Sequence, residues 1–102
     1  MVAVLEDTEL FFNMLNQRYG ILMFERLRNR SSITYTGELY SAKGEHFYIN
    51  IVVYKEKTVI QVFNVTFNTR VCIFQKAYNT SNDKRALSKS TSLIKFLDKI
   101  LS

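Results

Sequence analysis

The chain has one cysteine and one histidine. A single cysteine excludes an intrachain disulfide, and one cysteine with one histidine cannot supply the several ligands of a structural zinc site within one subunit. Neither a glycine-rich phosphate loop nor a paired-carboxylate signature is present. We therefore expect a non-enzymatic protein without a cofactor, a metal site or a small-molecule substrate.

Cys72 and His46 are the only pair that could act as a nucleophile and its base. Cys72 lies in the apolar run 71–74, which favours a small buried hydrophobic side chain over a reactive thiol. His46 follows Glu45 beside a predicted turn, a setting typical of an exposed histidine, and Glu38 lies on a neighbouring predicted strand. Catalysis is therefore not the function we expect.

The sequence also lacks long apolar runs. None approaches the roughly 20 residues that cross a bilayer, so we expect no membrane association. The start of the chain has no basic side chain and soon reaches Glu6 and Asp7, unlike a secretory signal. We expect an intracellular protein, cytoplasmic or nuclear. With 102 residues, 47% of them hydrophobic, the chain has material for a single domain over residues 1–102.

Residues 33–78 contain no proline, are rich in β-branched and aromatic side chains, and alternate between apolar and polar. This pattern predicts a meander of antiparallel strands. The predicted strands cover residues 33–40, 47–54, 58–65 and 70–76, with turns around Gly44, at 55–57 and at 68–69. In the second strand Phe47, Ile49, Ile51 and Val53 share the face that we expect in the core.

Two segments have patterns that are harder to interpret, one before this region and one inside it. Residues 21–28 could continue as helix or form a strand, and we favour a strand. Strand 70–76 carries apolar residues on both faces, which predicts that it is covered on both, either between sheet and helix or within an oligomer.

A helix is predicted at each end. The first has Asp7 or Thr8 as its N-cap and Gly20 as its stop, where a left-handed glycine would let Ile21 fold back onto the last turn. The second is amphipathic and begins near Asn82 or Asp83, or only at residues 90–91. The predicted fold class is α+β, with the order α-β-β-β-β-α. An antiparallel meander of three to five strands carries both helices on one face and leaves the other for solvent or a partner.

This element order is similar to that of small αβββα modules, which include the double-stranded-RNA-binding domain and the Alu-binding subunits of the signal recognition particle. The similarity is one of element order. The lysine-rich motif that opens the second helix of a double-stranded-RNA-binding domain is missing here, so no functional residue is transferred.

The net charge of +5 is unevenly distributed. Residues 1–45 hold five basic and six acidic side chains, whereas residues 46–102 hold nine basic and three acidic. The positive field therefore belongs to the C-terminal half, which favours a polyanionic partner.

Three groups of residues could provide a binding surface. The first is the basic face of the second helix, with Lys84, Arg85 and Lys89, which could neutralise phosphates. The second is the uncovered sheet face, where Tyr48 and Tyr54 lie near Lys55, Lys57 and Arg70 and could stack unpaired bases. Either Tyr35 or Tyr40 could lie near them. The third is a possible stripe of Arg26, Arg28 and Arg30, which would share one face if they lie on a strand.

The predicted function is binding of RNA or single-stranded DNA through the basic helix and the aromatic sheet face. The alternative is a protein-interaction or assembly subunit, such as a homodimer, that buries the same sheet face against another chain. Each surface also has a structural explanation, because lysine-rich helix faces and half-buried tyrosines are common in folded domains.

Overall fold

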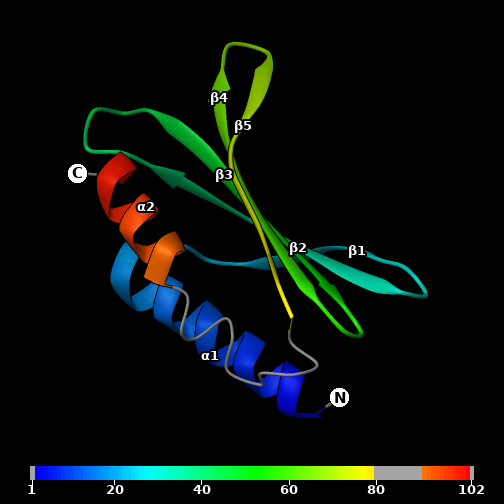
Figure 1. The fold of residues 1–102 in the computed structure, drawn as a ribbon. Helices are drawn as coiled ribbons and strands as arrows, with labels where there is room; N and C mark the ends of the chain where they lie inside the picture. The colour runs from blue at the N-terminus through cyan, green and yellow to red at the C-terminus, as the bar shows by residue number, and fades with distance from the viewer. Residues whose placement is uncertain (1, 80–90, 102) are drawn as a thin grey trace.

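The computed structural model describes residues 2–79 and 91–101, with the side chains of the first helix described from Thr8 onward. Its elements are α1 (Val2–Tyr19), β1 (Phe24–Arg28), β2 (Ser32–Tyr40), β3 (His46–Tyr54), β4 (Thr58–Thr66), β5 (Thr69–Tyr78) and α2 (Thr91–Leu101). The five strands form one antiparallel sheet in the order β1-β2-β3-β4-β5 (Figure 1). The predicted α+β class and meander are confirmed, with two strands more than the αβββα modules have.

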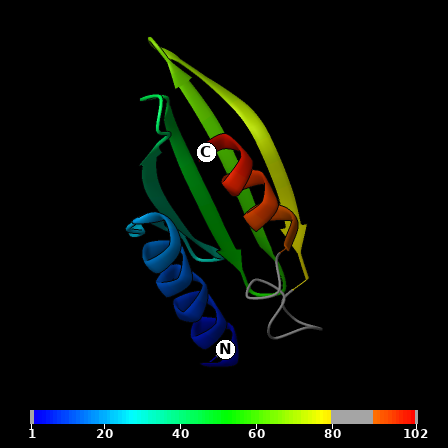
Figure 2. The same cartoon turned by 90° about the vertical axis from the view of Figure 1, so that its left-hand side faces the viewer.

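Both helices cover the same face of the sheet, as Figures 1 and 2 show from two directions. The core between the layers consists of buried apolar side chains from both helices and the central strands, among them Phe11, Leu15, Phe47, Ile49, Ile51, Ile60, Val62, Leu93 and Leu97. In the sheet, Ile49 lies opposite Val62 and Ile51 opposite Ile60, so the predicted period-two face of β3 is the core face.

The start of α1 differs from the prediction, whereas its end agrees with it. Asp7 and Thr8 lie inside the helix and not at its N-cap, because the good helix formers before them, such as Ala, Leu and Glu, extend the helix upstream. Gly20 adopts the left-handed φ of 71° and its N–H donates to the Asn16 carbonyl at 2.8 Å. Ile21 then turns back into the core and is fully buried.

The two helices are joined at their solvent side by Asp98 of α2. The Arg18 guanidinium donates to Asp98 Oδ2 at 2.8 Å, and the Tyr19 hydroxyl donates to Asp98 Oδ1 at 2.8 Å. These two donors, Arg18 first, hold the pKa of Asp98 below its ordinary value. The end of α1 is therefore attached to the middle of α2 across 79 residues of sequence.

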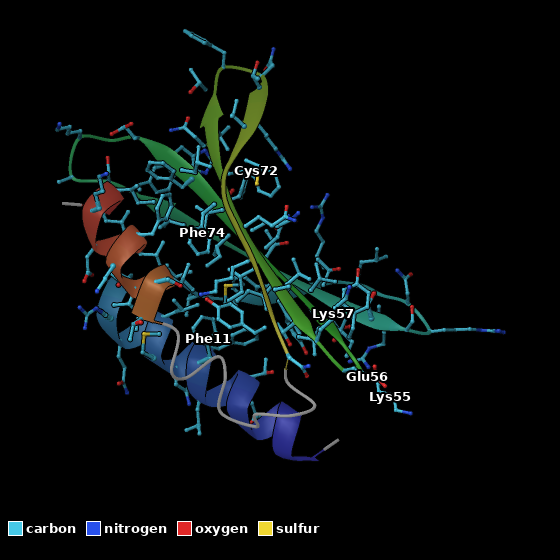
Figure 3. All side chains as sticks on the ribbon, viewed as in Figure 1. Phe11, Lys55, Glu56, Lys57, Cys72 and Phe74 are labelled. Atoms are coloured by element: carbon cyan, nitrogen blue, oxygen red, sulfur yellow. The ribbon has the colours of Figure 1, made fainter. Side chains whose placement is uncertain are left out.

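β5 is an edge strand, and the expectation that it is covered on both faces is wrong within this chain. Phe74 points toward the helices and packs on Phe96 of α2 with ring centroids 5.0 Å apart, whereas Cys72 points away from them (Figure 3). Cys72 is exposed, so the prediction of a buried thiol is also wrong. The reason is that β5 joins the core only through Phe74 and Tyr78 on its helix-facing side, and eight of its ten residues are exposed. The turn before β5 is formed by Phe67 and Asn68, one residue earlier than predicted.

Candidate nucleic-acid interface

The sheet face opposite the helices is the candidate interface and is called the open face. Residues paired across antiparallel strands point to the same side, so the register assigns its members. They are Phe24, Leu27, Ser32, Thr34, Thr36, Glu38, Tyr40, His46, Tyr48, Asn50, Val52, Tyr54, Val59, Gln61, Phe63, Val65, Arg70, Cys72, Gln75 and Ala77. Glu38 is the one acidic residue in this set.

Three rings and a guanidinium, here called the ring cluster, lie in contact on the open face. The Tyr40 and His46 rings are stacked, with centroids 4.6 Å apart and planes 8° apart. The Tyr48 ring follows at 4.8 Å from His46, and the Arg70 guanidinium carbon lies 4.5 Å from the Tyr48 centroid. The β2–β3 register creates the first contact by placing Tyr40 opposite His46.

Glu38 lies beside the ring cluster, directly opposite Tyr48 in the β2–β3 register. The Glu38 carboxylate is the main reason that the pKa of Tyr48 is raised, because it attracts the proton of the Tyr48 hydroxyl. His46 Nε2 lies 3.6 Å from Glu38 Oε1, beyond hydrogen-bond distance, and has no hydrogen-bond partner in the part of the chain that the structure describes. The carboxylate is half-exposed.

A groove of about 390 Å³ lies next to Glu38 and is called the aromatic groove. Its lining comprises Gly20, Leu22, Phe24, Thr36, Gly37, Glu38, Tyr40 and Tyr48. β1 pairs with residues 33–36 of β2 alone, so the second half of β2 has no neighbouring strand on that side. Residues 21–23 instead run close over Gly37, and the groove lies between this segment and the rings.

The predicted aromatic and basic residues of the sheet divide into two groups. Tyr48 and Arg70 belong to the ring cluster. Tyr54 lies at the other end of β3, where the Lys57 ammonium is 5.3 Å from its ring centroid. Lys55 and Lys57 are both exposed in the β3–β4 turn. Figure 3 labels these two residues at the lower right. The open face thus has one cation–aromatic pair at each end.

The predicted arginine stripe on β1 is not formed. The β1–β2 register shifts between Glu25 and Leu27, so Arg26 is an extra residue that breaks the alternation. Arg28 pairs with Glu25, with Nη2 and Oε1 2.7 Å apart, and this bond lowers the pKa of Glu25. Arg30 lies in the bend after the strand. Sequence alternation could not anticipate this result, because a bulge leaves no clear mark in a five-residue strand.

The basic second helix and the open face lie on opposite sides of the sheet. Lys84, Arg85 and Lys89 are outside the described residues. Within α2, Lys95 and Lys99 are exposed on the helix layer, on the side of the sheet away from Tyr48. A ligand bound flat on the open face would therefore not touch α2.

The sequence prediction omitted Glu38 and the groove residues Leu22 and Phe24 from the site, and it left open whether Tyr35 or Tyr40 lies near Tyr48. Alternation in β2 was enough to place Glu38 and Tyr40 together on one face. Their contact with β3, however, depends on the register across the β2–β3 turn, and the groove depends on where β1 begins. Tyr35, the other tyrosine of β2, packs on Phe12 under the helix layer.

The described residues contain no group of three His, Cys, Asp or Glu side chains that could hold a metal ion. Neither α1 nor α2 combines the length and apolarity that crossing a membrane requires. No protein-family model, curated protein or solved structure matches this chain. The functional interpretation therefore depends on the geometry of the open face.

Proposed function

We propose that this chain is a nucleic-acid-binding module that binds RNA or single-stranded DNA on its open face. The observation that carries the proposal is the ring cluster, in which aromatic surface and a guanidinium lie together on a face that no described helix covers. Base–aromatic stacking contributes roughly 1 to 3 kcal/mol per base and needs no particular sequence.

Several features favour single strands over duplexes. A base inside a duplex already stacks on its neighbours and has no free face. Rings such as Tyr40 can therefore stack only on bases that are unpaired. Tyr40 covers His46 with one ring face and is 62% exposed, which leaves ring surface for a ligand. The aromatic groove is near the small end of the roughly 300 to 1,000 Å³ that ligand pockets occupy, a size suited to a single base.

Phosphates would be bound by the cations at the two ends of the open face, Arg70 at one and Lys55 and Lys57 at the other. Arginine can bond a phosphate oxygen while its plane stays stacked on a ring. Three phosphate contacts on a single strand predict a slope of log Kobs against log salt of about −2.

The test is a fluorescence anisotropy titration of labelled, unstructured RNA and DNA oligonucleotides at two salt concentrations, with a duplex of the same length as the control. We expect single strands to bind more tightly than the duplex, and binding to weaken at the higher salt. Replacing Arg70 with Ala should weaken binding and make the salt slope shallower. Absence of single-strand binding at low salt would contradict the proposal.

A second candidate function is association with another protein chain along the edge of β5. Val71 and Ile73 are exposed on this strand, Phe67 is 97% exposed at the preceding turn, and β5 is the last strand of the sheet. An unprotected edge with apolar side chains is a template for strand pairing. Size-exclusion chromatography with light scattering tests it: a dimer that Val71→Lys converts to monomer supports this candidate, and a monomer at all concentrations contradicts self-association.

A further inference from the structure

Glu38 is the one acid among the open-face residues that the register assigns, and it lies at the centre of the proposed nucleic-acid site. A carboxylate repels phosphates, so it opposes binding unless the ligand offers it hydrogen-bond donors. We propose that Glu38 accepts hydrogen bonds from a guanine base held in the aromatic groove. This inference rests on the proposed function and names the base that the groove selects.

The carboxylate has the acceptor capacity that guanine requires. An ionised carboxylate is an acceptor only, with two oxygens and about four lone-pair positions. Tyr48 lies directly opposite Glu38 in the β2–β3 register. The half-exposed carboxylate can take two donors in parallel.

Among the four bases, guanine alone presents two adjacent donors on its Watson–Crick edge, N1–H and the N2 amino group. Adenine and cytosine present one amino donor beside a ring acceptor, and uracil presents one N–H between two carbonyl oxygens. For these three, a bidentate approach would place a base acceptor against a carboxylate oxygen, where neither group has a proton to donate. Charge-assisted bidentate pairs therefore discriminate strongly in favour of guanine.

The walls of the groove suit a flat ring. Phe24, 64% exposed, and Tyr40 line it together with Leu22, so apolar and aromatic surface is available on both sides of the carboxylate. Tyr48 lies between Glu38 and Arg70: it is opposite Glu38 in the β2–β3 register, and its ring contacts the Arg70 guanidinium. A base that pairs with Glu38 would thus bring its strand toward the guanidinium, and a phosphate could bind there.

The experiment uses the full chain and labelled uridine-rich RNA oligonucleotides that carry one central guanine, inosine, adenine or uracil. We expect guanine to be preferred over adenine by about tenfold to about a hundredfold. Inosine lacks the N2 amino group, so it should bind roughly tenfold more weakly than guanine. This base series needs no variant, and hence it is independent of any effect of mutation on folding.

Glu38→Gln gives a second, sharper prediction. A carboxamide presents one acceptor and one donor, which match the N6 amino group and N1 of adenine as well as N1–H and O6 of guanine. The variant should therefore lose the guanine preference. Glu9→Gln is the matched control: it removes the same charge from an exposed position on α1, on the other side of the sheet, and should keep the guanine preference.

The outcomes separate the two proposals. A guanine preference that Glu38→Gln abolishes supports the inference. Equal affinity of the wild-type protein for all four oligonucleotides overturns the guanine assignment and leaves single-strand binding intact. No binding to any of them overturns both.

Discussion

The guanidinium of Arg70 lies 4.5 Å from the ring centroid of Tyr48, although β4 separates their strands in the sheet. The side chain of Arg70 reaches across β4 at the end where β4 and β5 meet in a two-residue turn. The contact joins the last strand to β3, the middle strand of the sheet, and it places the cation next to the ring on which we expect a base to stack.

Tyr48 is therefore the residue whose removal should weaken binding most directly. Tyr48→Ala should reduce affinity for single-stranded RNA by about fivefold to about 150-fold, because a stacking surface worth roughly 1 to 3 kcal/mol is lost. Tyr48→Phe keeps the ring and its contact with Arg70 but loses the hydroxyl next to Glu38. We expect it to bind uridine-only RNA nearly as well as the wild type, as measured by anisotropy. Equal affinities of the Ala variant and the wild type would exclude Tyr48 from the interface.

The attachment of α1 to α2 through Asp98 predicts a pH-dependent contribution to stability. Arg18 and Tyr19 lower the pKa of Asp98 in the folded state below its ordinary pKa of 3.8. The stabilisation is therefore complete at pH values above 3.8, and it is lost as the pH falls through the lower pKa of the folded state. The melting temperature of Asp98→Asn should be modestly lower than that of the wild type near neutral pH, since both partners are about half-exposed.

Thermal unfolding followed by circular dichroism across the pH range measures this difference. We expect the gap between Asp98→Asn and the wild type to be constant at neutral pH and to narrow below the ordinary Asp pKa of 3.8. Arg18→Gln should give a similar profile, and the double variant should lose little more than either single one. A gap that does not change with pH would show that Asp98 acts through something other than its charge.

At Gly37 the segment before β1 lies close to β2. A Cβ at this position would lie 2.6 Å from Met23 Sδ, 2.8 Å from Ile21 Cγ2 and 3.0 Å from the Leu22 carbonyl oxygen. Gly37→Ala should therefore destabilise the protein by about 1 to 3 kcal/mol, because buried Ile21 and the Leu22 backbone cannot move freely. Chemical denaturation measures the loss.

Met23 provides the control for Gly37. Its sulfur is the nearest atom to the added methyl group, so Met23→Ala in the Gly37→Ala background should lose less stability than Met23→Ala in the wild type. Additive losses would mean that the clash is with Ile21 and the Leu22 backbone alone.

The β4–β5 turn contains a side chain in an unfavourable backbone conformation. Phe67 has φ 55° and is 97% exposed, so it is in the left-handed region without burial to compensate. Phe67→Gly should raise the free energy of unfolding by about 0.5 to 1 kcal/mol, the relief of strain being partly offset by the flexibility of glycine in the unfolded chain. Asn68→Gly, where φ is not positive, is the matched control. It should leave stability unchanged or lower it.

Much of the fold could be predicted because its signals are local. Alternation identified the core face of β3 through Phe47, Ile49 and Ile51, and Gly20 marked the end of α1. The misplaced start of α1 shows the limit of capping signals, since Asp and Thr are also tolerated inside a helix that upstream residues extend. β5 shows another limit. Apolar residues on both faces indicate a covered strand, but this largely exposed edge strand has the same pattern.

The candidate site was less predictable, because its contacts depend on register. Tyr48 and Arg70 were both identified as candidates from residue type, yet their contact requires the β3–β4 and β4–β5 pairings together. Glu38 and Tyr40 become neighbours of Tyr48 and His46 only through the β2–β3 pairing. The arginines of β1 fail as a stripe for the same reason, since one bulge changes which way each side chain points.

The most direct test of the open-face interface is a ¹⁵N–¹H chemical-shift titration of the full chain with an unstructured, guanine-containing RNA. We predict that the largest perturbations fall on β2 and β3 around Glu38, Tyr40 and Tyr48 and on β5 at Arg70, with the amides of α1 and α2 little changed. Perturbations confined to the helix layer, or a complete absence of change at low salt, would contradict it.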